Sequence, residues 1–171
     1  MKALKQLFLA ILTITFMVSC GGEEKKESEE KVKVKIGEKK AEKKVDDNPN
    51  NVVITADDFM KYNKTEIRVK AGQKVKITLR HIGKMNAQIM GHNVVVLNSG
   101  VDPIAFAASA ATSRDTDYIP EGSTDVIAHT KMIGGGETAV IEFDAPAAGT
   151  YDFLCSFPGH YAMMKGKFIV E

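Results

Sequence analysis

Hydrophobic and polar residues alternate along several short segments of this chain, and this alternation is the pattern of half-buried β-strands. It is strict in residues 74–80, where every second position holds lysine, threonine or arginine. Residues 93–97 instead form a nearly continuous apolar run, which predicts a strand buried on both faces. The segments expected as strands are 52–55, 66–70, 74–80, 93–97, 138–143, 151–155 and 167–170. Glycine and proline separate them, so the sequence predicts an all-β protein with a Greek-key β-sandwich fold.

One segment departs from the strand pattern. Residues 103–113 are rich in alanine, which is the strongest helix former among the amino acids. We therefore expect a short helical insertion at 103–113, placed between two strands of the sandwich.

The N-terminal segment differs in composition from the rest of the chain. Two lysines precede an apolar stretch at residues 7–18, which is shorter than the roughly 20 residues that a membrane span needs. A serine and Cys20 follow, so residues 1–19 are typical of a secretory signal peptide of the bacterial lipoprotein kind. An ordinary signal peptide with an incidental cysteine is the alternative. We expect an exported lipoprotein, anchored in a membrane through lipid on Cys20 and facing the periplasm or the cell surface.

Residues 20–50 are expected to be the lipidated cysteine followed by a charged, flexible tether. Glutamate and lysine dominate this segment, aromatic residues are absent from it, and valine and isoleucine are sparse. Such a segment cannot bury enough apolar surface to offset the loss of chain entropy. The folded domain is therefore expected at 51–171. The formal net charge of the whole chain is only +1, which gives no electrostatic reason to expect nucleic acid as a partner.

The strongest chemical signal in the sequence is a short loop with three potential metal ligands. Cys155, His160 and Met164 are spaced Cys-x4-His-x3-Met. Taken singly, each would more often be a buried or hydrogen-bonded side chain than a ligand. Together they supply a thiolate, an imidazole and a thioether, and two histidines, one cysteine and a weak axial methionine form a blue-copper electron-transfer site. His92, far upstream, offers the second imidazole.

Three segments carry a resemblance to a known family. Residues 90–93, 126–131 and 155–166 resemble segments of the azurin family of cupredoxins, in the same order and at nearly the same spacing. The resemblance extends over 51–171, the whole of the expected domain. It implies a cupredoxin-like sandwich of about eight strands with one type 1 copper ion as cofactor. The implied function is one-electron transfer between redox proteins outside the cytoplasm.

The resemblance also assigns a role to each ligand. His92 and His160 would supply the two equatorial nitrogens. Cys155 would supply the equatorial thiolate and Met164 the weak axial sulfur. The Gly91 carbonyl would lie opposite the methionine, as it does in azurins.

The residues around the ligands have implied roles too. Met163 is the competing axial candidate, although the Cys-x4-His-x3-Met spacing favours Met164. Asn93 is expected to bridge the two ligand segments. The Phe157 backbone N–H is expected to point at the Cys155 sulfur and to raise the reduction potential.

The chain departs from azurins in ways that leave the ligands unchanged. It has two cysteines and no tryptophan, so it lacks the usual azurin disulfide, and Val94 replaces the large aromatic residue that many azurins bury there. His81 and His129 also match azurin histidines. We expect both to be exposed or satisfied within the core rather than bound to copper, and either could respond to pH.

The rim around the second copper histidine is expected to form a docking surface. This docking patch would comprise Met60, Met85, Ile89, Met90, Phe157, Ala162 and Met163. Flexible thioethers on an apolar surface suit brief contacts with several partners. We expect a monomer that meets redox proteins such as c-type cytochromes or terminal reductases or oxidases. An enzyme is not expected, because four histidines are too few for a second copper centre. The alternative function is copper binding or delivery, since thioethers are also Cu(I) ligands.

Overall fold

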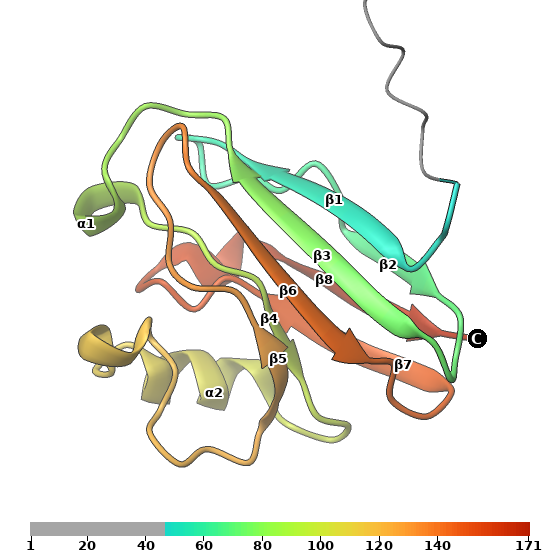
Figure 1. Cartoon of the computed structure of the whole chain (residues 1–171). Coiled ribbons are helices and arrows are strands. Elements are labelled where there is room, and N and C mark those ends of the chain that lie inside the picture. The colour runs from blue at the N-terminus through green and yellow to red at the C-terminus, as the bar shows by residue number, and fades with distance from the viewer. Residues whose placement is uncertain (1–46) are drawn as a thin grey trace, which may run out of the picture. The chain divides into compact units, whose positions relative to one another are not determined.

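The computed structural model describes residues 47–171, and every structural statement below refers to that part of the chain (Figure 1). The predicted signal peptide 1–19, the predicted lipidation site Cys20 and residues 21–46 of the predicted tether lie outside the described residues.

Asn50, expected to be the last residue of the tether, is packed into the folded part of the chain. It is fully buried. Its side-chain amide donates to the Lys70 carbonyl at 3.0 Å, and its side-chain oxygen accepts from the Lys70 N–H at 2.8 Å. Its carbonyl accepts from the Lys76 N–H at 2.8 Å. The packed region therefore includes Asn50, one residue before the expected start of the domain.

Eight strands in the described residues form two sheets (Figure 1). One sheet has the order β1 (Asn51–Ala56), β3 (Lys74–His81), β6 (Thr138–Asp144). The other has the order β2 (Glu66–Val69), β8 (Lys165–Val170), β7 (Gly149–Leu154), β4 (Val95–Leu97), β5 (Val126–His129). The β1–β3 and β2–β8 pairs are parallel and the other pairs are antiparallel. The predicted all-β sandwich is confirmed, and each expected strand is present.

The core lies between the two sheets, and the alternation in β3 explains how it forms. Val75, Ile77 and Leu79 are fully buried, while Lys76 between them is exposed and Thr78 is partly buried. Phe153 of β7 and Phe168 of β8 are buried in the same cluster. Full burial of a large apolar side chain contributes about 1.5–3 kcal/mol, so this strip of five residues holds the sheets together.

A short helix covers the outer face of β4. This helix, α2, spans Pro103–Ala110, so the predicted insertion is confirmed but ends three residues earlier than expected. The Asp102 carboxylate caps it by accepting from the Ile104 N–H at 2.9 Å. Phe106 and Ala110 are buried against β4. Because α2 takes one face and the core takes the other, β4 is buried on both faces, as its apolar run predicts.

Strand β5 and the single turn α1 were not predicted from the sequence, and neither were the 3-10 helices Arg114–Thr116 and His160–Ala162. Strand β5 lacks a clear alternation and its side chains are partly or fully exposed, but it pairs with β4 as an edge strand. The single turn α1 (Ala87–Met90) depends on a local cap, since the Asn86 side chain accepts from the N–H groups of Gln88 and Ile89. Propensity over four residues is too weak a signal to find either element.

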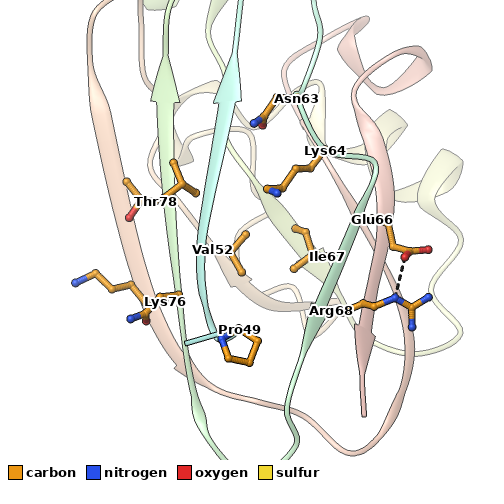
Figure 2. Close-up of a pocket in the computed structure, with 11 residues that line it drawn as sticks. Pro49, Val52, Asn63, Lys64, Glu66, Ile67, Arg68, Lys76 and Thr78 are labelled. Carbon is orange, nitrogen blue, oxygen red and sulfur yellow. Dashed lines mark hydrogen bonds and ion pairs between the residues drawn. The ribbon is translucent and has the colours of Figure 1, made fainter. Parts of the chain in front are cut away.

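A groove of about 650 Å³ opens between β1 and β2 (Figure 2). Val52, Lys64 and Ile67 are among the residues that line it, and Arg68 in its wall pairs with Glu66 at 2.9 Å. None of the predicted copper ligands lines this groove. In the described region, no helix has the length and apolar character needed to cross a membrane.

Candidate metal centre

Three side chains that are distant in sequence converge at one end of the sandwich. His92 follows α1, Cys155 follows β7, and His160 begins a short 3-10 helix (His160–Ala162). All three are buried, and their candidate ligand atoms lie within 4.8 Å of one another. The Cys155 Sγ is 4.0 Å from His92 Nδ1 and 3.7 Å from His160 Nδ1. Both histidines therefore present the same ring nitrogen to the cysteine sulfur.

A backbone contact fixes which nitrogen of His92 is available. His92 Nε2 lies 2.9 Å from the Asp57 carbonyl oxygen, which can only accept a hydrogen bond. The Nε2 atom must therefore carry the proton, and this leaves a lone pair on Nδ1. A second hydrogen bond of this kind is how proteins set the tautomer of a metal-binding histidine.

The loop between Cys155 and Met164 is closed by its own backbone. The Cys155 N–H donates to the Met164 carbonyl at 2.9 Å, and the Met164 N–H donates to the His160 carbonyl at 2.8 Å. Gly159, with a φ of 83°, makes the left-handed turn that precedes His160. Met164 is fully buried in the cluster that contains Cys155, whereas Met163 is 56% exposed.

The backbone of Gly91 reaches the same site. Its carbonyl oxygen is 3.9 Å from the Cys155 sulfur. A side chain at this position would meet the Ala87 carbonyl at 2.4 Å and the Met132 sulfur at 2.8 Å. Only glycine therefore allows the chain to pass here. Met132, which sequence analysis did not single out, packs against this turn.

Burial sets the protonation states of the three potential ligands. Desolvation lowers the pKa of His92 and of His160 to about 4, so both imidazoles are neutral at neutral pH. It raises the pKa of the Cys155 thiol to about 11, and backbone hydrogen bonds from Asn93 and Phe157 oppose that rise. Metal ions bind neutral imidazole and thiolate, so binding here must release the thiol proton.

Asn93 connects the two ligand-bearing segments. Its side-chain amide donates to the Ser156 hydroxyl at 2.8 Å and to the Asp117 carbonyl at 3.0 Å. Its side-chain oxygen accepts from the Ser156 N–H at 2.9 Å. The neighbour of His92 is thus bonded to the neighbour of Cys155, and the predicted bridge is present.

The other two histidines lie outside the group of potential ligands. His81 is buried and stacks on His92 with ring centroids 4.4 Å apart. Its Nδ1 accepts from the Gly83 N–H at 3.0 Å, and its Nε2 is 2.9 Å from the Met90 carbonyl. His129 is exposed on β5. His81 is therefore satisfied within the core, as expected.

The predicted docking patch is only partly exposed. Met85, Ile89, Ala162 and Met163 are exposed, whereas Met60, Met90 and Phe157 are partly buried. Exposed apolar side chains outside the predicted patch include Phe59 at 76%, Ile82 at 65% and Ile104 at 64%. An apolar groove of about 320 Å³, which was not predicted either, lies between α2 and the ligand loop, and Ile104 and Ala162 help to line it.

A further residue that sequence analysis missed is Tyr62. Its hydroxyl donates to the Asn93 carbonyl, and its ring packs on Phe153 with centroids 5.8 Å apart. Tyrosine is a common core residue, and nothing in the local sequence indicates that this one approaches a ligand segment 31 residues away.

The donor set fits copper better than other common metals. One thiolate and two imidazoles, with a buried thioether beside the thiolate, combine soft sulfur with nitrogen. This combination is typical of blue-copper sites, whereas structural zinc sites use four cysteine or histidine ligands.

Comparison with known proteins identifies the family. The family described as copper binding proteins, plastocyanin/azurin family, matches residues 52–171. Azurin-2 of Alcaligenes xylosoxydans xylosoxydans is 43% identical over 117 residues, which are 66% of this chain and 91% of that protein. Outer membrane protein H.8 of Neisseria meningitidis serogroup B is 40% identical over 117 residues, which are 67% of this chain and 63% of that protein.

A solved structure shows the same relationship. Dithionite-reduced auracyanin from Roseiflexus castenholzii superposes with a TM-score of 0.65 at 35% identity, over 71% of this chain and 97% of that one. The predicted resemblance to azurins is confirmed, and copper is the metal that the His92, Cys155 and His160 group fits. The chain belongs to the plastocyanin/azurin family of copper-binding proteins.

Proposed function

We propose that this protein carries single electrons between redox proteins outside the cytoplasm, using one type 1 copper ion held by His92, Cys155, His160 and Met164. The observation that carries the proposal is the buried triangle of two Nδ1 atoms and one Sγ atom, all within 4.8 Å, in a chain of the plastocyanin/azurin family. Its azurin relatives and this group together support a blue copper electron carrier.

The protein's part in electron transfer is to hold its ligands still. Bound copper would supply the chemistry, taking one electron as Cu(II) and giving it up as Cu(I). His92 is held by Asp57, and the loop of Cys155 and Met164 is held by its own backbone bonds and by Asn93. A ligand set that cannot rearrange suits both oxidation states and lowers the cost of each transfer.

Met164 is the proposed axial ligand and the Gly91 carbonyl the proposed group opposite it. Met164 is buried beside Cys155, whereas the competing Met163 is more than half exposed. The Gly91 oxygen lies 3.9 Å from the cysteine sulfur, which is close enough for a weak contact with a shared metal.

Electrons are proposed to leave and enter through His160. It is almost fully buried, but its ring lies 4.5 Å from Phe157 of the docking patch. The exposed patch residues Met85, Ile89 and Met163 suit transient contact with redox proteins such as c-type cytochromes or terminal reductases or oxidases. The protein itself is proposed to be a monomer.

A carrier is favoured over a copper enzyme by the remaining histidines. The His81 ring nitrogens are both engaged by backbone groups, and His129 is exposed on a different element from the ligands. Copper delivery is the second candidate, because Met85 and Met163 expose thioethers that could bind Cu(I). A delivery protein should bind a second Cu(I) per chain, whereas a carrier should bind one copper tightly.

The protein is also proposed to be an exported lipoprotein with lipid on Cys20. Its support is the lipoprotein-type N-terminal sequence and the 40% identity to a protein named for the outer membrane. Cys20→Ser should move the protein from the membrane fraction to the soluble fraction and leave the copper site unchanged. A Cys20→Ser protein that stayed with membranes would contradict the anchor.

The central experiment measures colour. The oxidised copper-loaded protein should be intensely blue, with narrow copper hyperfine splitting in electron spin resonance, and dithionite should bleach it reversibly. Cys155→Ser should lose the colour, and the control His129→Gln should keep it, because His129 lies outside the ligand group. A colourless copper complex, or colour that survives in Cys155→Ser, would refute the proposed function.

A further inference from the structure

Tyr62 reaches the copper site from a part of the fold that supplies no ligand. It follows β1 and forms an isolated bridge with Ala56. Its ring packs on Phe153 in the core, and its hydroxyl donates to the Asn93 carbonyl. The hydroxyl therefore lies at the segment that joins His92 to the cysteine loop.

The Asn93 residue that Tyr62 contacts is fixed on three sides. Its side chain is bonded to Ser156, as described above. Its backbone N–H is hydrogen-bonded to the Cys155 side chain, where it favours the thiolate. Its carbonyl accepts from Tyr62. Loss of the Tyr62 hydroxyl would leave this carbonyl without that donor and would free the backbone that aims an N–H at the sulfur.

We propose that Tyr62 is a positioning residue that raises the reduction potential of the copper centre, because its hydroxyl holds the Asn93 backbone in place beside the Cys155 sulfur. The inference rests on the proposed copper site. The thiolate carries more negative charge when copper is Cu(I) than when it is Cu(II). A donor aimed at the sulfur therefore stabilises the reduced form more than the oxidised form.

The chain offers a matched control for removing this hydroxyl. Tyr151 is also a core tyrosine whose hydroxyl donates to a backbone carbonyl, that of Ala147, at 2.7 Å. It lies in β7 and packs on Phe168. Tyr151→Phe and Tyr62→Phe remove the same atom and the same kind of hydrogen bond, but only the second change touches the copper site.

The experiment is a redox titration of the full-length, copper-loaded protein, its two variants and the unchanged chain. Tyr62→Phe should lower the ratio of reduced to oxidised protein at a fixed ambient potential by about tenfold, which equals about 59 mV for one electron. Its blue absorption band should move to lower energy, because the Asn93 N–H at the sulfur is held less firmly. Tyr151→Phe should shift neither. Thermal unfolding of the metal-free proteins shows how much stability each hydroxyl contributes.

A second variant covers the case in which Tyr62→Phe does not fold or does not take up copper. A ring-fluorinated tyrosine placed at position 62 keeps the shape and makes the hydroxyl a stronger donor, so the potential should rise. A potential for Tyr62→Phe that equals that of Tyr151→Phe, or exceeds it, would overturn the proposal. So would a fluorinated variant with an unchanged potential. If the unchanged chain is itself not blue, the proposed function fails first.

Discussion

The protonation states of the buried ligands predict how the metal-free protein responds to acid. His92 and His160 are almost fully buried, and desolvation lowers each pKa from 6.5 to about 4. In the unfolded chain both imidazoles would bind protons as the pH falls through about 6.5. The folded protein resists protonation until about pH 4. Between these values the unfolded state binds more protons, so stability must fall as the pH falls.

The magnitude follows from the two pKa values. At about pH 5 the unfolded histidine is almost wholly protonated and the folded one is mostly neutral. The linkage relation then gives a loss of about 2 kcal/mol for each histidine, or about 4 kcal/mol for both. This is a large part of the roughly 5–15 kcal/mol that stabilises a typical domain. Cys155 acts at the other end of the range, because its raised pKa lowers stability between about pH 9 and pH 11.

Urea unfolding of the metal-free protein at about pH 7.5 and about pH 5 measures this loss directly. We expect the free energy of unfolding to fall by about 4 kcal/mol, with the urea dependence unchanged. The copper-loaded protein should lose at least as much, because coordination blocks each Nδ1 in the folded state while the unfolded chain still takes up its protons. The control His129→Gln, on the exposed strand β5, should behave as the unchanged chain does. Equal stability of the metal-free protein at the two pH values would refute the reasoning.

Three further predictions concern the ligand loop and its support. The Met164→Leu protein should stay blue and have a higher reduction potential, because a weak donor that favours Cu(II) is lost. Met163→Leu should leave the potential unchanged, and the reverse result in a redox titration would make Met163 the axial ligand. Asn93→Ala should lower the free energy of unfolding in urea by about 1–3 kcal/mol, since it leaves the buried Ser156 N–H without its partner. Met163→Lys should preserve the blue spectrum but slow electron exchange with a partner, as measured by stopped flow. If the exchange rate instead depends steeply on salt and is unchanged in Met163→Lys, the docking site lies on a charged face.

The parts of the fold that the sequence predicts are those with local signals. The strict alternation of β3 follows from one face meeting the core and the other meeting solvent. The apolar run of β4 follows from the core on one side and α2 on the other. Strand β5 has no such signal, because it is formed by its pairing with β4 rather than by its own pattern.

The candidate site shows the same division between local and distant contacts. Cys155, His160 and Met164 share one loop, so their spacing can be read from the sequence. His92 was proposed because a blue-copper donor set needs a second imidazole, and its equatorial role came from the resemblance to a family; the distance of His92 and Asn93 from the loop in sequence gives no spacing signal. Tyr62 and the packing of Met132 beside the Gly91 turn could not be predicted, because each depends on how separate loops meet at one end of the sandwich.

Burial of the ligands lowers the stability of the metal-free protein away from neutral pH, and the same burial prepares the site for copper. Desolvation keeps His92 and His160 neutral and disfavours a free Cys155 thiolate, so the metal-free site has a narrow pH range of stability. Copper uses the neutral imidazoles directly, because it takes their lone pairs, and it displaces the thiol proton. The backbone donors at Asn93 and Phe157 already point at the sulfur before the metal arrives. The protein therefore folds around a site whose charge distribution matches a copper–thiolate bond, and electron transfer then needs no rearrangement of the surrounding dipoles.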